Sequence, residues 1–256
     1  MTPVLLCGLA LIAYGWAAAR YTRRFPRRAF GASILSFVSG LLVIAAVLSP
    51  PFDRLADDSF CWHMLQHLAL TLVAPPLLLL GAPGTLIAAS APAPIARRIG
   101  RALHGPFGRI LGNASAAWLA FVGVLWLTHL SPLYEAALED ERVHAAEHAL
   151  YLMSAIWFWT PVASKGVGPI PLPFPARMLY LFVAVPPCAF LGLAIYDAPM
   201  PLYPHYLAGK MLTQVMNDQR AGGELMWLGG GLLLFAAFLL TAWRWAEHER
   251  PTRRTA

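Results

Sequence analysis

Long apolar stretches alternate with short polar segments along the whole chain. Seven stretches can be marked with a window of about 19 residues, the length at which a helix crosses the apolar core of a bilayer. They cover residues 4–19, 30–48, 60–80, 114–130, 144–162, 178–195 and 225–243. We therefore predict an all-α fold, a polytopic membrane bundle of seven transmembrane helices that forms one integral membrane domain over residues 1–256.

Composition supports the bilayer as the environment of the chain. Hydrophobic residues make up 58% of the sequence and charged residues only 12%, about half of the roughly 25% of a soluble domain. The three cysteines, Cys7, Cys61 and Cys188, lack the paired spacing of a disulfide framework or a C-x-x-C motif. Basic residues follow the first apolar segment rather than precede it, so we interpret this segment as a retained helix and not a signal peptide.

Basic residues divide unevenly between the two ends of the predicted helices. Of the 19 Lys and Arg residues, only Arg54, Arg142, Lys210 and Arg220 fall on the side that holds the start of the chain. Because positive residues stay in the cytoplasm, we predict an amino terminus outside and a carboxyl terminus inside the cell. Topology and anionic inner-leaflet lipids then account for the net charge of +6, and no nucleic-acid partner is expected.

Prolines shape both the inner loops and the spans. The inner connection 81–113 mixes apolar residues with Arg, which predicts an amphipathic piece at the membrane surface, interrupted by Gly and Pro. The Pro-rich inner loop 165–175 is expected to be extended. Pro75 and Pro76, and later Pro186 and Pro187, should kink their helices or free carbonyls that neighbouring side chains then satisfy.

Histidines collect at the outer ends of the predicted spans. His63 and His67 begin the third span, His144 and His148 begin the fifth, and His129 ends the fourth. A spacing of four residues places both members of a pair on one helix face, one turn apart. Because the dipole at a helix N-terminus disfavours a protonated imidazole, neutral and metal-competent histidines are favoured there. Two such pairs with His129 predict a metal site; the alternative is that they join helices by hydrogen bonds.

Other potential ligands lie on the same side. Asp218 and Glu224 are placed near the outer surface, where a carboxylate orients a histidine or joins the coordination; alternatively, they match a helix dipole. Sulfur is present in Cys61, Met64, Met200, Met211, Met216 and Met226, although methionine usually fills gaps in packing. Imidazole with sulfur suits copper(I), and imidazole with carboxylate also suits zinc. Copper is therefore favoured, with zinc as the alternative.

Three blocks of sequence carry a resemblance to a known family. The run HMLQHLALTLVAPPLLLLGAP from His63 resembles the signature helix of the multi-span CtaG-type cytochrome c oxidase assembly factors. The later runs EHALYLMSAIWFWTPV and DQRAGGELMW are similar to further blocks of that family, in the same order. The residues at matching positions are His63, His67, His144, His148 and Asp218, whereas His129 rests on its depth alone. A more apolar residue is expected near Glu224 in the family.

The resemblance implies a function in oxidase biogenesis. The expected protein is a multi-pass protein of the bacterial inner membrane, needed to mature a haem–copper cytochrome c oxidase. It would handle copper for the oxidase catalytic subunit or exchange it with other copper-handling proteins. We expect a non-enzymatic assembly factor with no catalytic residue.

Three other functions fit parts of the sequence. His144-Ala-Ala-Glu147-His148 matches the H-x-x-E-H motif of inverted zinc proteases, in which the Glu activates zinc-bound water; a membrane zinc hydrolase acting on lipids is a related version. Copper transport or resistance would need ligands deeper in the membrane, for which Cys188, Thr71 and Ser154 are candidates. Histidines on facing helices could also ligate haem.

Overall fold

The computed structural model describes residues 3–25, 30–166 and 171–250, and the regular elements in these ranges are all helical. They are α1 (Pro3–Arg24), α2 (Gly31–Val47), α3 (Pro50–Asp58), α4 (Phe60–Leu68), the π-helical turn η1 (Ala69–Val73), α5 (Ala74–Leu80), α6 (Pro83–Ser90), α7 (Ala93–His104), α8 (Pro106–Leu111), α9 (Ala114–His129), α10 (Pro132–Glu139), α11 (Glu141–Ala163), α12 (Phe174–Tyr196), the 3₁₀ turn η2 (Pro204–Leu207), α13 (Leu212–Glu224), the π-helical turn η3 (Leu225–Gly229) and α14 (Gly230–Glu249). The all-α class is confirmed.

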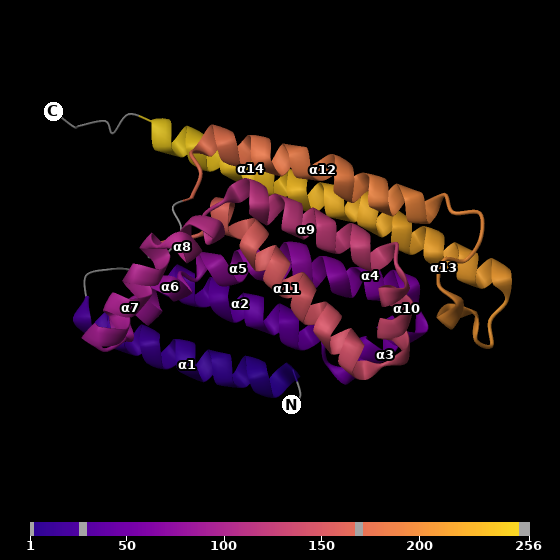
Figure 1. Ribbon diagram of the computed structural model, residues 1–256, viewed down its shortest axis with the longest axis horizontal. Helices are drawn as coiled ribbons and strands as arrows, with labels where there is room; N and C mark the ends of the chain where they lie inside the picture. The colour runs from indigo at the N-terminus through magenta and orange to yellow at the C-terminus, as the bar shows by residue number, and fades with distance from the viewer. Residues whose placement is uncertain (1–2, 26–29, 167–170, 251–256) are drawn as a thin grey trace.

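The long helices run roughly side by side (Figure 1). α12 packs along α14, α11 along α9 and α5, and α2 along α5, while α1 lies at the margin against α2 and α6. The short helices gather at the two ends of this bundle: α3 and α10 lie at one end, and α6, α7 and α8 lie at the other, where α14 also ends (Figure 1). The bundle therefore has two distinct ends, each closed by short helices.

Several helices are long and apolar enough to cross a membrane. Four pass by length and composition: Pro3–Arg24, Phe60–Leu80, Phe174–Tyr196 and Leu212–Glu249. The bent pairs α2 with α3 and α9 with α10 raise the number to six if each pair is one span. Each of the seven predicted apolar segments lies on a helix, but α11 is not among the candidates although it has 23 residues. Its N-terminal half, which carries Glu147 and two histidines, lowers its mean hydropathy.

The last predicted segment starts too late. Helical structure begins at Leu212, thirteen residues before the predicted start, because α13, η3 and α14 form one continuous helical run. The polar sequence of α13 hid this extension from a hydropathy window. Asp218 therefore lies on a helix and not in a loop.

One of the two effects predicted for the prolines within the spans, a freed carbonyl that a neighbouring side chain satisfies, occurs at Pro75. Pro75 lacks the N–H that would bond the carbonyl of Thr71 four residues earlier, and Trp159 Nε1 donates to that carbonyl at 2.9 Å. The π-helical turn η1 immediately precedes this proline. Pro186 and Pro187 lie inside α12, which is assigned as one helix.

The connection 81–113 folds into helical pieces interrupted at Gly and Pro, as predicted. Pro83, Pro92 and Pro106 each stand at the start of a short helix, where the missing N–H costs nothing. Part of the Pro-rich loop 165–175 lies outside the described residues, so its predicted extended form stays a prediction.

Glycines let α13 approach two helices at backbone distance. A Cβ at Gly223 would lie 2.7 Å from the backbone nitrogen of Tyr196, and one at Gly192 would lie 2.7 Å from the carbonyl oxygen of Gly223. A Cβ at Gly222 would lie 2.4 Å from the ring of Phe60. Small residues of this kind permit close helix packing in membranes. They fix α13 against both α12 and the first turn of α4.

Candidate metal centre

Five histidines from three helices meet at the end of the bundle that holds α3 and α10. α4 supplies His63 and His67, α9 ends with His129, and α11 supplies His144 and His148. Four of them are at least nine-tenths buried: their exposed fractions are 0% for His63, 3% for His67, 2% for His129 and 8% for His148. The structure thus brings together all five histidines that the sequence singles out.

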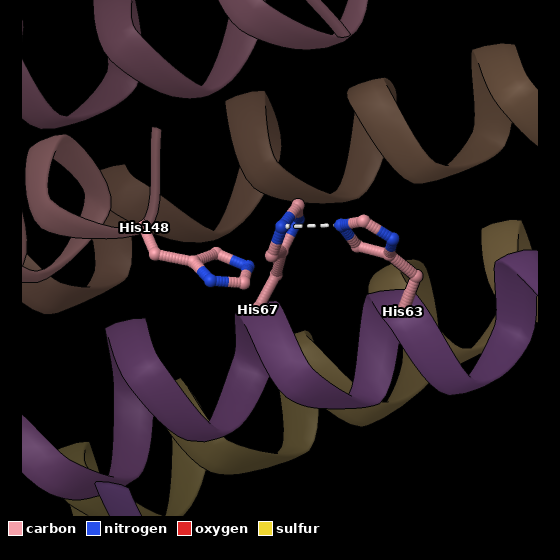
Figure 2. A group of neighbouring side chains, drawn as sticks. All are labelled: His63, His67 and His148. Atoms are coloured by element: carbon pink, nitrogen blue, oxygen red, sulfur yellow. Dashed lines mark hydrogen bonds between the residues drawn. The ribbon is translucent and has the colours of Figure 1, made fainter. Parts of the chain in front are cut away.

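Figure 2 shows the tightest part of this group. His63 Nε2 and His67 Nε2 lie 3.0 Å apart, so one donates a hydrogen bond to the other. The ring of His148 points toward this pair, and the three residues each offer a nitrogen within 4.8 Å of the others. Nitrogens that share one ion at about 2.0–2.1 Å lie roughly 3.5 Å from one another. Small ring rotations would therefore suffice to close the three around an ion.

His144 and His129 extend the group on either side. The ring centroid of His144 lies 4.2 Å from that of His148 and 5.1 Å from that of His63. The His129 centroid lies 5.6 Å from that of His67. Successive rings are thus close enough to pass an ion along a path of imidazoles.

Hydrogen bonding sets the tautomer of His129. Its Nδ1 lies 2.8 Å from the carbonyl oxygen of Leu125, to which only a protonated nitrogen can donate. The proton on Nδ1 leaves the lone pair on Nε2, which is the arrangement of metal-ligating histidines with an oriented second nitrogen. His129 Nε2 is buried and has no hydrogen-bond partner.

Buried polar atoms without partners are concentrated in this group. His67 Nδ1, His129 Nε2, His144 Nε2, His148 Nε2 and Glu147 Oε2 all lack a hydrogen bond. Such atoms are rare in folded proteins because each costs about 1–3 kcal/mol. Four imidazole nitrogens and one carboxylate oxygen form a donor set that suits a bound cation.

Glu147 is the acidic side chain that the structure places among the histidines. It is 3% exposed, and its Oε1 accepts a hydrogen bond from Tyr151 at 3.3 Å. The Tyr151 hydroxyl also lies 3.2 Å from His129 Nδ1. Glu147 thus lies within the network of the site, where a negative charge would balance that of a cation.

Tyrosines of α10 and of the loop before α13 pack against the group. Three of them are buried: Tyr134 of α10, Tyr203 just before η2, and Tyr206 within η2. The Tyr206 hydroxyl lies 3.2 Å from His63 Nδ1 and 3.3 Å from the Tyr134 hydroxyl. Burial raises the pKa of Tyr203 and Tyr206 above the usual value, so both stay neutral hydroxyls that can donate hydrogen bonds.

His144 is the partly exposed member of the set, as it is only half-buried. Asp53 and Asp57 of α3 lie near enough to interact with it electrostatically. The four other histidines are buried, and Tyr134 of α10 packs against the rings of His63, His67 and His129.

Asp218 of α13 contacts the start of α4 and is not part of the group of three histidine nitrogens. Its Oδ2 accepts from the backbone N–H of Phe60 at 2.7 Å, and its Oδ1 accepts from the Ser59 hydroxyl at 2.7 Å. The backbone N–H of Cys61 adds a longer bond of 3.3 Å. Both oxygens are therefore engaged by the free end of α4, where a carboxylate complements the helix dipole. This contact favours a role for Asp218 in positioning the histidine helix. Glu224, the other potential acidic ligand, is exposed.

The sulfur-bearing residues separate into two groups. Met64 and Met226 are buried, whereas Met200 and Met211 are 70% and 64% exposed.

The sequence alone did not identify the tyrosines of the site. A signal existed for Tyr151, which follows His148 by three residues and His144 by seven, so the helical repeat places it on the same face of α11. Tyr134, Tyr203 and Tyr206 carry no comparable signal, because they lie on the short helix α10 and in the segment around η2, away from the helices that carry the histidines.

Proteins of similar sequence come from mycobacteria. The chain is 24% identical over 252 residues to the uncharacterized protein Mb0105 of Mycobacterium bovis, and equally to MT0111 of Mycobacterium tuberculosis. It is 22% identical over 226 residues to ML1998 of Mycobacterium leprae. These matches cover 94%, 94% and 84% of this chain but only 38%, 38% and 34% of those proteins. The chain thus spans little more than a third of their length; no solved structure matches it.

A protein family also matches most of the chain. Residues 12–248 match the family described as cytochrome c oxidase caa3 assembly factor (Caa3_CtaG). This range includes all five histidines, Glu147, Asp218 and the helices that carry them. The chain belongs to the caa3 cytochrome c oxidase assembly factor family.

Proposed function

We propose that this assembly factor binds copper at its histidine group and delivers it to the catalytic subunit of a haem–copper oxidase. Copper is the cargo of this function, and the protein performs no catalysis. The observation that supports the proposal best is the set of buried imidazole nitrogens without hydrogen-bond partners. His63, His67 and His148 form its centre, with His129 and His144 as neighbouring ligands.

The surroundings of the histidines agree with a cation cargo. His63 and His144 are the fourth residues of α4 and α11, near helix N-termini whose dipoles disfavour added protons and keep the lone pairs free for metal. A charge in a low-dielectric interior is costly unless a counter-charge is near, and Glu147 supplies one. Neutral imidazoles with one acid thus offer a site for copper.

Loading and release proceed through His144 in this proposal. It is the half-buried histidine of the set, and the acidic side chains of Asp53 and Asp57 near it attract cations from solution. From there, neighbouring rings lead to the enclosed His63 and His67. A partner subunit docking at this end would receive the ion by the same route.

We further propose the topology that this function needs. The chain forms one domain with seven spans in the bacterial inner membrane, with α11 as the fifth, the amino terminus outside and the carboxyl terminus in the cytoplasm. The 23 residues of α11 extend over roughly 34 Å, enough to cross a core of about 30 Å. Arg97, Arg98 and Arg101 of α7 lie at the bundle end opposite the histidines, as the positive-inside rule requires.

Oxidase maturation in cells tests the proposal. Cells carrying the double substitution His63→Ala and His67→Ala should contain oxidase protein that lacks copper and activity, while the assembly factor itself remains in the membrane at a normal level. The substitution His248→Ala, at the opposite end of the bundle, is the matched control and should leave the oxidase active. Normal oxidase activity in the double variant would contradict the proposal.

A zinc-dependent hydrolase is the second candidate, favoured by one observation. Glu147 is buried among the histidines and keeps one carboxylate oxygen without a hydrogen-bond partner, as a base that activates zinc-bound water would. Purified protein loaded with zinc should then hydrolyse lipid or peptide substrates, and Glu147→Gln should abolish turnover without loss of zinc. Absence of turnover in the zinc-loaded wild-type protein excludes this candidate.

A further inference from the structure

A small cavity adjoins the histidines on the side toward the middle of the bundle. Its volume is about 30 Å³, and its walls include Met64, His67, Thr71, His129, Cys188 and Met226. These residues come from four separate parts of the chain, on α4 and η1, α9, α12 and η3. Three sulfur-bearing side chains and two histidines of the candidate metal centre thus line one cavity.

The cavity has the size and the lining of a site for a soft ion. A volume of roughly 10–15 Å³ is enough for one water molecule, but a water also needs two to four polar partners. The Thr71 hydroxyl is already engaged, since it donates to the carbonyl oxygen of His67 at 2.6 Å, and the remaining lining is largely apolar. Thioether and thiol sulfur with imidazole is instead the ligand set that selects Cu(I).

The two histidines that line this cavity each carry a nitrogen without a hydrogen-bond partner. His67 Nδ1 and His129 Nε2 lack hydrogen-bond partners, and both side chains are at least 97% buried. The tautomer of His129 leaves its lone pair on Nε2, as the bond to Leu125 requires. The cavity therefore has nitrogen ligands that are free to bind in addition to its sulfur atoms.

The backbone around the cavity is irregular in two places. Both π-helical turns of the described chain contribute to its walls: η1 through Thr71 and η3 through Met226. Such turns insert one residue into a helix and occur often at functional sites. Here they turn side chains of two neighbouring helices toward the same space, while the unbranched methionines can adjust their rotamers to an ion.

We propose that this cavity is a second metal position, selective for Cu(I), in which Met64, Met226 and Cys188 act together with His67 and His129. This inference rests on the proposed copper function and deepens it. The histidine group above accepts copper from the outside, and the sulfur-lined position holds the reduced ion out of contact with water. His67 and His129 belong to both positions, so an ion moves between them without leaving its imidazole ligands.

The selectivity follows from the difference between soft and borderline ions. Sulfur ligands stabilise Cu(I), whereas Zn(II) is bound well by imidazole and carboxylate alone. Removal of the sulfur atoms should therefore weaken Cu(I) binding and leave Zn(II) binding at the histidines intact. A purely structural role of the methionines would affect both ions equally.

The test uses the full-length protein in detergent and a variant with Met64→Leu, Met226→Leu and Cys188→Ala. Leucine keeps the volume of methionine, so the fold is largely preserved. The probes are Cu(I), kept reduced with ascorbate and measured by competition with a coloured chelator, and Zn(II). The matched control is Met153→Leu, a methionine on α11 that is 64% exposed. X-ray absorption at the copper edge reports sulfur among the neighbours of the ion.

We expect sulfur neighbours in the Cu(I)-loaded wild-type protein and in the control. In the triple variant they disappear and the Cu(I) affinity falls by at least about tenfold, while the Zn(II) affinity is unchanged. Cu(I) bound by nitrogen alone in the wild-type protein, with equal affinity in the variant, overturns this inference but leaves the proposed function standing. A wild-type protein that binds no copper overturns both, and equal losses for Cu(I) and Zn(II) assign the methionines to packing.

Discussion

The contact between Asp218 and the start of α4 separates two roles for this carboxylate. If it positions the histidine helix, Asp218→Asn should reduce stability more than metal affinity. If it is a metal ligand, the same substitution should remove metal binding. The amide keeps the size of the carboxylate but loses its charge and one of its two acceptor oxygens.

The hydrogen bonds give the expected magnitude. Asp218 forms two bonds of 2.7 Å, from Phe60 N–H and the Ser59 hydroxyl, and a longer one from Cys61 N–H. A bond to a charged group contributes about 1.5–3 kcal/mol and a neutral one about 1 kcal/mol. Replacing two charged bonds by one neutral bond should lower the free energy of unfolding by about 2–5 kcal/mol.

Metal affinity should change less. Affinity falls only with the fraction of molecules in which the start of α4 is displaced, and Gly222 against Phe60 still holds this turn to α13. We expect a loss of less than about tenfold, because Asp218 bonds to the end of α4 and not to a histidine; removal of a partner that hydrogen-bonds a ligand costs about 10–100-fold, and loss of a ligand should cost more.

Thermal unfolding in detergent and chelator competition with Cu(I) measure the two quantities on one preparation. Glu224→Gln, which changes an exposed acid at the end of the same helix, is the control and should alter neither. Loss of copper binding in Asp218→Asn at unchanged thermal stability would refute the positioning role.

Three further predictions concern packing, loading and access. Gly223→Ala places a methyl group 2.7 Å from the Tyr196 backbone nitrogen and should lower the free energy of unfolding by about 1–3 kcal/mol. The control Gly231→Ala, whose Cβ meets nothing within 4 Å, should leave stability unchanged. Equal melting temperatures of the two variants would show that α12 and α13 are not in close contact. Cu(I) at 100 times its dissociation constant should stabilise the protein by about 2.7 kcal/mol, and this shift should vanish in His63→Ala with His67→Ala; a shift that persists would place the copper elsewhere. His144→Ala should slow copper loading in stopped-flow measurements, with His248→Ala as the unaffected control, and an unchanged rate would exclude His144 as the point of access.

Much of the fold and the histidine set could be predicted from hydropathy and helical periodicity. Apolar runs located every long helix, and the four-residue spacing placed His63 with His67 and His144 with His148 on common faces. His129 was found because the alternation of spans assigns it to the same depth. These features are local in sequence, so a single chain reveals them.

The remaining features depend on contacts between distant segments. The polar composition of α13 concealed its helix, which is formed because Gly222 and Gly223 let it pack closely on α4 and α12. The same packing brings Asp218 to the free N–H groups of α4, a partnership across 158 residues from Phe60. Likewise, Met226, Cys188 and His67 line one cavity only because three helical segments converge, and no spacing in the sequence reveals it.

Metal content of the purified protein tests the central claim most directly. The full-length chain in detergent is incubated with Cu(I) under reducing conditions, freed of excess metal and measured by mass spectrometry, beside the double variant His63→Ala with His67→Ala and the control His248→Ala. The account predicts stoichiometric copper in the wild-type protein and the control, and its loss in the double variant, which should remain folded. The same copper content in all three proteins, or none in the wild type, would contradict it.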